Sequence, residues 1–374
     1  MPVKRRKMTV SSVYVHIPFC AGKCRYCDFV SFAGKESLTD DYIFSLLKDA
    51  EGYRGEAAET VFIGGGTPSV LSCGQTERLL RGLADIFCIK PGAEFTMESN
   101  PCSLTKEKLR LYRDLGVNRL SVGLQSTLDS ELKMLGRLHD YKTFLDAYAM
   151  ARECFDNINI DLISGLPGQR PEDFALTLDR VTALAPEHIS AYSLILEEGT
   201  PLEKEVSSGR LSRPDEETDR QIYALTAQKL LISGYKRYEI SNYSREGYEC
   251  RHNLAYWTGK DYIGIGCAAH SLQNGIRSRR SSNLTEYMTH PGPCESIALT
   301  KKDRYEEFIM LRLRLTEGFS FRQCASDTGT DIRCARAREL ETLQRGGYII
   351  INGDNCRLSE KGMDLCDAVT LQLI

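Results

Sequence analysis

Short apolar, β-branched runs recur along the first half of the chain, each bounded by Gly, Pro, Asn or Ser. Amphipathic stretches with helical spacing separate them. The pattern predicts strands at Val13–Ile17, Thr60–Ile63, Glu94–Met97, Arg119–Gly123, Ile158–Ile163 and His188–Leu194, and helices at Asp40–Tyr53, Gln75–Phe87, Lys106–Leu115, Lys142–Cys154 and Pro171–Leu184. Because strand and helix alternate, we expect an α/β fold, a partial (β/α)6 barrel of parallel strands with its chemistry in the loops that follow the strands.

The rest of the chain has a different pattern. Residues 201–290 are polar, with one long predicted helix at Glu216–Ile232 and aromatic-rich loops at Tyr235–His270, which suggest a lid or side wall. Helices are then predicted near Arg304–Arg314, Ser320–Asp327, Asp331–Gln344 and Ser359–Ala368, with short strands at Tyr348–Ile351 and Cys356–Leu358. We therefore predict three parts: a barrel at 1–200, a side wall at 201–290 and a small winged-helix-like domain at 291–374.

Composition narrows the class of protein. With 48 basic and 51 acidic residues the net charge is -3, and acidic residues interrupt any basic stripe in the C-terminal helices, so we expect no nucleic-acid partner. No apolar run reaches the length of a membrane span, and the basic start, residues 1–7, precedes no signal-peptide core. The 14 cysteines are dispersed apart from one cluster. We expect a cytoplasmic protein that meets the membrane only through a partner.

The cysteine cluster has the spacing C-x3-C-x2-C at Cys20, Cys24 and Cys27, directly after the first predicted strand. Three thiolates on a [4Fe–4S] cluster leave one iron free to bind another ligand. The alternatives are a zinc site that recruits a distant fourth ligand, and chance clustering. We interpret the motif as a [4Fe–4S] site.

Polar residues and glycines follow the next strands. Gly64-Gly65-Gly66-Thr67-Pro68 would let a ligand approach the backbone, or would form a tight turn. Glu98 and Gln125 end two predicted strands, and Asp161 lies within an apolar one. A charge there is costly unless it is paired or bound, so Asp161 is either a ligand contact or part of a salt bridge.

The run Tyr14-Val15-His16-Ile17-Pro18-Phe19-Cys20, followed by C-x3-C-x2-C-x-F, resembles the radical S-adenosylmethionine (SAM) superfamily. Members use a reduced cluster to cleave SAM to a 5′-deoxyadenosyl radical. The resemblance implies that the primary SAM positions are Tyr14, Gly65, Glu98, Gln125, Arg137 and Asp161, with Arg137 on the methionine carboxylate and Asp161 on the ribose. It also implies that Tyr26, Gly66 and Thr67 match positions that contact a second SAM. His16 either tunes the cluster or is an ordinary core histidine.

The local sequence around the cysteines narrows the resemblance to one branch of the superfamily. That branch contains oxygen-independent coproporphyrinogen III oxidase (HemN) and the shorter heme chaperones (HemW). The oxidase has a cysteine where this chain has Phe29, and only 19 residues precede Cys20, so the oxidase's N-terminal arm is not matched. Both departures weigh against coproporphyrinogen oxidation.

The motif H-N-x-x-Y-W at His252–Trp257 resembles the heme-chaperone signature. His252 could ligate heme iron, as could Cys250, while Tyr256 and Trp257 offer flat surfaces to a porphyrin. The alternative is that His252 caps a turn and the aromatic residues pack the barrel. These features predict a heme chaperone with a [4Fe–4S] cluster and SAM, which passes heme to acceptor proteins of the respiratory membrane. The open alternatives are a radical SAM enzyme acting on a tetrapyrrole and a winged-helix regulator that uses the cluster as a sensor. A homodimer that depends on the cluster is a further expectation.

Overall fold

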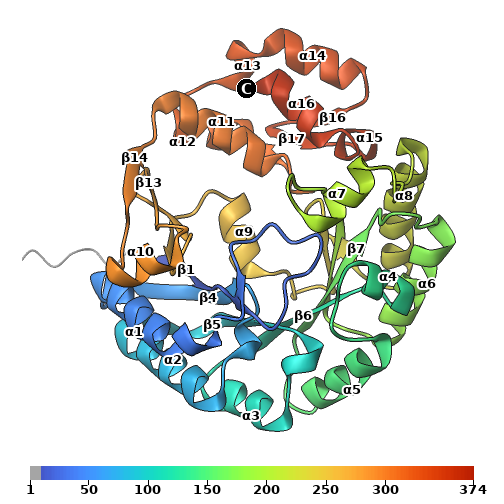
Figure 1. The fold of residues 1–374 in the computed structure, drawn as a ribbon. Coiled ribbons are helices and arrows are strands. Elements are labelled where there is room, and N and C mark those ends of the chain that lie inside the picture. The colour runs from blue at the N-terminus through green and yellow to red at the C-terminus, as the bar shows by residue number, and fades with distance from the viewer. Residues whose placement is uncertain (1–9) are drawn as a thin grey trace, which may run out of the picture.

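The structure is a computed structural model that describes residues 10–374, so the basic start of the chain, residues 1–7, lies outside the described part. All six predicted strands form, run parallel and lie side by side in chain order within one curved sheet (Figure 1). They are β1 (Val10–Ile17), β4 (Ala57–Gly65), β5 (Cys88–Ser99), β6 (Arg119–Gln125), β7 (Ile158–Ser164) and β8 (His188–Ser193).

The five predicted helices form the outer layer of this sheet (Figure 1). They are α1 (Thr39–Ala50), α2 (Cys73–Ile86), α3 (Lys106–Asp114), α5 (Tyr141–Arg152) and α6 (Pro171–Ala183). Side-chain caps start several of them, since Ser72, Thr105 and Asp140 each accept a backbone N–H of the following turn. The short helix α4 (Asp129–Met134) was not predicted, because six residues are too few for a helical period to show.

Side chains along each strand point alternately toward the helices and toward the barrel interior. Val15, Ile63, Met97, Leu120 and Ile158 stand in register on adjacent strands, and all are fully buried against the helices. The intervening positions of the strands project into the barrel interior. The apolar row thus supplies the core, and the polar residues between its members are left to line the interior.

The prediction of aromatic-rich loops at Tyr235–His270 was wrong. This stretch extends the sheet at both edges: β10 pairs antiparallel with β8, while β11 pairs parallel with β1 and continues into antiparallel strands. These strands are only two to four residues long, and β11 contains Gly264, so the local pattern does not reveal them. The new elements are α7 (Pro201–Ser207), α8 (Glu216–Ile232), β9 (Lys236–Arg237), β10 (Asn242–Ser244), α9 (Arg251–Trp257), β11 (Tyr262–Ile265), β12 (His270–Gln273), β13 (Ile276–Arg279), α10 (Leu284–Thr289) and β14 (Glu295–Ala298).

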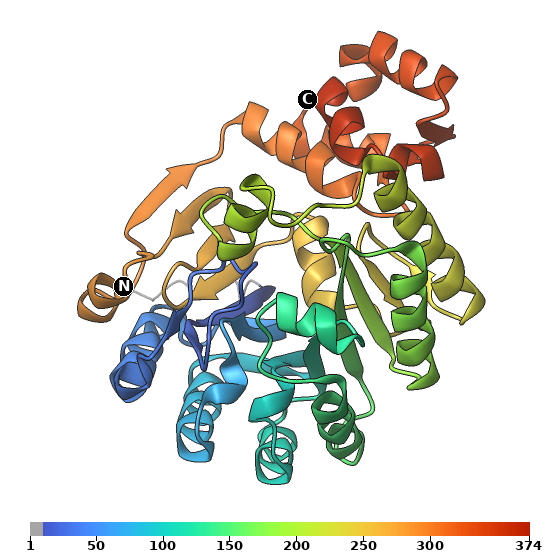
Figure 2. The same ribbon diagram turned by 45° about the vertical axis from the view of Figure 1, so that its right-hand side comes forward.

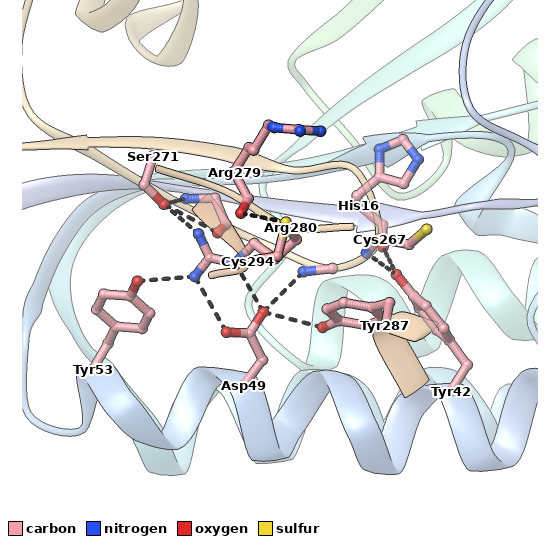
Figure 3. Close-up of polar contacts among 12 residues, drawn as sticks. His16, Tyr42, Asp49, Tyr53, Cys267, Ser271, Arg279, Arg280, Tyr287 and Cys294 are labelled. Atoms are coloured by element: carbon pink, nitrogen blue, oxygen red, sulfur yellow. Dashed lines mark hydrogen bonds and ion pairs between the residues drawn. The ribbon is translucent and has the colours of Figure 1, made fainter. Parts of the chain in front are cut away.

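A buried polar network ties α1 to the added strands (Figure 3). Asp49 and Arg280 form an ion pair with side chains that are 1% and 0% exposed, and Asp49 also accepts the hydroxyl of Tyr287. Tyr42 donates to the backbone carbonyl of His16 at 2.7 Å and accepts the amide of Cys267. The network therefore fixes β11 and its neighbours against the first βα unit, which leads into the cysteine loop.

The C-terminal part packs as a separate core at one end of the sheet (Figure 2). Helices and a three-stranded sheet alternate there, and two of the three strands were predicted. The predicted helices at Asp331–Gln344 and Ser359–Ala368 are each broken in two. Its elements are α11 (Lys301–Arg312), β15 (Phe319–Ser320), α12 (Phe321–Thr328), α13 (Ile332–Ala335), α14 (Ala337–Arg345), β16 (Ile349–Asn352), β17 (Asn355–Leu358), α15 (Glu360–Met363) and α16 (Cys366–Leu373). The predicted boundaries at 200 and 290 stay predictions, although β14 pairs with β13, so the sheet continues past residue 290. Among the described helices, none combines the length and apolar character needed to cross a membrane.

Candidate functional site

The cysteine loop leaves the carboxyl end of β1 and is held at both ends. Its short strands β2 (Phe19–Cys20) and β3 (Phe32–Ala33) pair with each other. Inside the barrel wall, His16 donates from Nε2 to the carbonyl of Val30 at 2.8 Å and accepts the hydroxyl of Tyr14 at Nδ1 at 3.0 Å. Burial lowers the pKa of His16, so the neutral ring that these two bonds require is favoured. His16 is thus an anchor of the loop.

A pocket of about 390 Å³ opens beside this loop. It collects residues from the loop that follows β1 and from β4, β5, β6, β7 and β8, as expected for a barrel of parallel strands. Every predicted cluster ligand and every predicted SAM residue except Tyr14 lines it: Cys20, Cys24, Tyr26, Cys27, Gly65, Gly66, Thr67, Glu98, Gln125, Arg137 and Asp161.

The three cysteines lie together at the pocket. All three are unpaired thiols that face it. Among residues 10–374, no three His, Cys, Asp or Glu side chains lie close enough to bind one ion. In a [4Fe–4S] cluster each thiolate binds a different iron, whereas the thiolates of a zinc site share one ion. The [4Fe–4S] site and the zinc site with a distant fourth ligand both stay predictions.

Two of the cysteine sulfurs have a side-chain hydrogen-bond donor nearby. The hydroxyl of Thr67 lies 3.4 Å from Cys20 Sγ, and Nη1 of Arg137 lies 3.3 Å from Cys24 Sγ. Burial raises the pKa of the Cys27 thiol. Hydrogen bonds to the sulfur ligands are among the features that tune an iron–sulfur cluster.

The glycine loop after β4 packs so closely that side chains are excluded. Gly65 has φ +110°, and a Cβ there would lie 2.5 Å from Nδ1 of His16. A Cβ on Gly66 would lie 3.0 Å from Cys20 Sγ and 2.8 Å from the carbonyl of Phe19. The glycines thus let the loop rest directly on the cysteine loop.

Two carboxyl groups, those of Glu98 and Asp161, face the pocket. Burial, reinforced by the charge of Asp161, raises the pKa of Glu98 to about 8, while the backbone N–H of Gly65 donates to Glu98 at 3.1 Å and opposes the shift. Asp161 accepts from Ser121 at 2.8 Å and from Asn159 at 2.7 Å. Asp161 is therefore paired with neutral donors and forms no ion pair among the described residues. The salt-bridge alternative for Asp161 finds no support here.

Gln125 and Arg137 complete the wall. Gln125 has φ +76°, which is uncommon for a residue with a side chain and occurs at the end of β6 where the register shifts. Arg137 donates from Nη2 to the carbonyl of Gly123 at 2.8 Å, and its buried Nε has no hydrogen-bond partner among the described residues. A guanidinium with unused donor capacity in this pocket suits a carboxylate ligand.

Tyr14 lies in a neighbouring cavity of about 320 Å³. That cavity shares Glu98, Ser121, Asp161 and Tyr192 with the 390 Å³ pocket beside the cysteine loop, which we call the cluster pocket. The assignment of Tyr14 to SAM stays a prediction, and its contact in the structure is with His16.

Helix α9 carries the H-N-x-x-Y-W motif and packs between β4 and α11. His252 is 1% exposed; its Nδ1 lies 2.8 Å from the hydroxyl of Thr60 and its Nε2 lies 3.2 Å from that of Tyr256. Burial, followed by the charge of Arg119, lowers the pKa of His252 to about 3. Both ring nitrogens are therefore engaged by hydroxyl groups.

The motif residues do not face a common surface. His252 and Tyr256 line the 320 Å³ cavity, while Trp257 lies toward the C-terminal domain with the guanidinium of Arg314 over its ring, 5.2 Å from the ring centroid. Cys250, the other candidate heme ligand, is fully buried and donates its thiol to Glu94.

Several residues of the site were missed by sequence reasoning. Ser121 supports Asp161, and Tyr192 closes the pocket from β8. Glu94 holds α9 by accepting the backbone N–H groups of Arg251 and His252 at 2.9 and 3.0 Å. Ser121 could have been found from alternation, since it stands two positions from Gly123 on the inward face of β6. Glu94 carries no such signal, because its partners are far away in the chain.

Comparison with known proteins agrees with this geometry. A profile of the Radical SAM superfamily matches residues 14–181, and a profile of the HemN C-terminal domain matches residues 299–365. The solved structure of coproporphyrinogen III oxidase (HemN) from Escherichia coli, a radical SAM enzyme, superposes with a TM-score of 0.86 at 24% identity, covering 98% of this chain and 90% of that chain. This match confirms the predicted α/β partial barrel with its C-terminal domain.

Curated relatives match over nearly the whole chain. The heme chaperone HemW of Lactococcus lactis is 36% identical over 359 residues, which are 95% of either chain. The heme chaperone HemW of Escherichia coli is 35% identical over 367 residues, covering 95% of this chain and 96% of the relative, and that of Bacillus subtilis is 33% identical over 353 residues, covering 91% and 93%. With identity of this level along both chains, the protein belongs to the HemW family of the radical SAM superfamily.

Proposed function

We propose that this protein is a heme chaperone, which binds heme and transfers it to acceptor proteins, among them respiratory proteins of the membrane. In this proposal Cys20, Cys24 and Cys27 hold a [4Fe–4S] cluster, and SAM binds beside it. The observation that carries the proposal is the combination, in one HemW-family chain, of three cysteines around one pocket with the H-N-x-x-Y-W helix at its neighbouring cavity.

The pocket supports SAM binding through chemistry suited to each end of the ligand. Arg137 has a buried Nε without a partner and would hold the methionine carboxylate. Asp161, oriented by Ser121 and Asn159, would accept from the ribose hydroxyls. Gly65, where His16 leaves no room for a side chain, would present its backbone to the methionine end at the pocket. The cluster, when bound, supplies an electron source and an iron with an open coordination position. The residues that match a second SAM in the oxidase also line the pocket: Tyr26 lies within the cysteine loop, and Gly66 and Thr67 lie beside it.

The heme contact is proposed at α9, with His252 as the axial ligand and Tyr256 and Trp257 beside the porphyrin. Coordination by His252 would require the ring to release Thr60 or Tyr256, because both nitrogens are engaged in the described conformation. A porphyrin could stack on the face of the Trp257 indole that Arg314 covers only if the Arg314 guanidinium moved away. Heme binding at this helix is thus coupled to a rearrangement of α9.

Titration of the purified full-length protein with heme tests the proposal. We expect a Soret band at stoichiometric heme, and a shifted or weakened band for His252→Gln. The matched control is His188→Gln, because His188 is equally buried and has both ring nitrogens engaged, by Asn159 and Tyr238, but lies outside the motif. Absence of the band in the wild type would refute the chaperone function. An unchanged band in His252→Gln would place heme elsewhere on the molecule.

The completeness of the pocket favours a second candidate function, a radical SAM enzyme acting on a tetrapyrrole. All predicted SAM residues except Tyr14 line one pocket with the cysteines. Anaerobic incubation of the cluster-loaded protein with dithionite, SAM and coproporphyrinogen III tests it. Formation of protoporphyrinogen with release of 5′-deoxyadenosine would support the enzyme. Absence of both products would reject the oxidase.

A further inference from the structure

Two of the three cysteine sulfurs have a side-chain hydrogen-bond donor, and the two donors differ in kind. Cys20 has the hydroxyl of Thr67, and Cys24 has the guanidinium of Arg137. The two side chains come from different parts of the barrel.

Thr67 is placed by its own backbone. Its N–H donates to the carbonyl of Phe19 at 2.8 Å, and the preceding Gly66 N–H donates to the carbonyl of Ile17 at 2.8 Å. These two bonds fix the loop against the residues that directly precede Cys20. Because Gly66 has no Cβ, the loop comes near enough for the Thr67 hydroxyl to reach the sulfur, at 3.4 Å.

Arg137 reaches the cysteine loop from the segment after α4. Its Nη2 is held by the carbonyl of Gly123 at 2.8 Å, which leaves Nη1 directed at Cys24 Sγ at 3.3 Å. The guanidinium is always charged, so it contributes both a hydrogen bond and a positive charge at this sulfur.

Hydrogen bonds and positive charge at ligand sulfurs stabilise the reduced form of an iron–sulfur cluster, which carries more negative charge. We propose that Thr67 and Arg137 are positioning residues that raise the reduction potential of the cluster by donating to Cys20 and Cys24. The inference rests on the proposed cluster site, and it assigns these side chains a role that needs no SAM.

The test compares reduction potentials in the reconstituted full-length protein without SAM, measured by EPR at a series of poised potentials. Thr67→Val removes the hydroxyl and keeps the branched shape, and Thr67→Ser is the matched control that keeps the donor. Loss of one hydrogen bond to a charged acceptor corresponds to about a tenfold change in an equilibrium. We expect the ratio of reduced to oxidised cluster at a fixed potential to fall about tenfold in Thr67→Val, a shift of about 59 mV for one electron, and to stay near wild type in Thr67→Ser.

Arg137→Leu is expected to lower the potential further, since it removes the charge as well as the donor. Equal potentials for wild type, Thr67→Val and Thr67→Ser would overturn the inference. If Thr67→Val and the smaller Thr67→Ala both fail to assemble a cluster while Thr67→Ser succeeds, the inference is also overturned, because the hydroxyl would then serve assembly. Failure of the wild type itself to assemble a four-iron cluster would instead refute the proposed cluster site.

Discussion

Replacement of Glu94 by Ala is expected to release the helix that carries the heme-chaperone motif. Glu94 lies on β5 and is 7% exposed. Its carboxylate accepts the backbone N–H groups of Arg251 and His252, the first residues of α9, and the thiol of Cys250. One side chain of the barrel wall therefore satisfies the start of the motif helix, whose free N–H groups would otherwise lack partners.

The magnitude follows from the two backbone donors. A buried donor that loses its partner costs about 1–3 kcal/mol, so Glu94→Ala should destabilise the protein by about 2–6 kcal/mol. Part of a total stability of about 5–15 kcal/mol would be lost. Glu94→Gln keeps one acceptor oxygen but turns an amide N–H₂ toward the helix, so an intermediate loss is expected.

Trp257 makes the assay specific to this helix. It is the only tryptophan of the chain and the last residue of α9. Its emission in urea titrations should therefore report the release of α9 at lower urea in Glu94→Ala than in wild type. The matched control is Glu59→Ala on the neighbouring strand, where the side chain is 41% exposed and, within residues 10–374, forms an ion pair only with Lys90. If Glu94→Ala unfolds at the same urea concentration as Glu59→Ala, the capping argument is refuted.

Three further outcomes follow from buried charges and rings. Asp49→Asn leaves the Arg280 guanidinium buried without its counter-charge and should cost about 3–5 kcal/mol in chemical unfolding, whereas Asp40→Asn, at an exposed pair on the same helix, should change the midpoint far less. The pKa of Glu98 rises on folding from 4.5 to about 8, so its contribution to stability is full below about pH 4.5 and is lost as the pH rises through 8. In Glu98→Gln the free energy of unfolding should change less with pH across that window. For His252 the pKa shift on folding has the opposite sign, from 6.5 down to about 3. The free energy of unfolding should therefore fall as the pH drops from about 6.5 toward 3, and it should fall less steeply in His252→Gln.

Local patterns predicted the centre of the fold because the six parallel strands are apolar runs bounded by turn residues. The edges were not predictable in this way. β11 has the sequence Tyr262-Ile263-Gly264-Ile265, and a Cβ on Gly264 would lie 2.0 Å from the carbonyl of His270. The glycine that weakens the strand pattern is therefore required by the close pairing of β11 with β12. Strand formation here depends on partners, and single-segment patterns do not contain them.

The same division holds at the site. Cys20, Cys24 and Cys27 share one short loop, so their spacing alone predicted that they would meet. Glu94 and His252 are separated by 158 residues along the chain, and their contact exists only because α9 folds back onto β5. The sequence identified the histidine as a candidate ligand but contained no sign that both of its nitrogens would be engaged.

That engagement sets the energetic condition for the heme binding that we propose at α9. His252 is hydrogen-bonded to Thr60 and Tyr256. It lines a cavity that shares Glu98 and Asp161 with the cluster pocket. Iron can replace a hydroxyl at one ring nitrogen only if the imidazole turns or the helix moves, and the helix is fastened by Glu94. Each of these hydrogen bonds opposes coordination in proportion to its own stability. The free energy of the hydrogen bonds that keep His252 and α9 in this position must be overcome before the iron binds. The observed affinity for heme is therefore the intrinsic affinity of His252 for heme iron, reduced by that free energy.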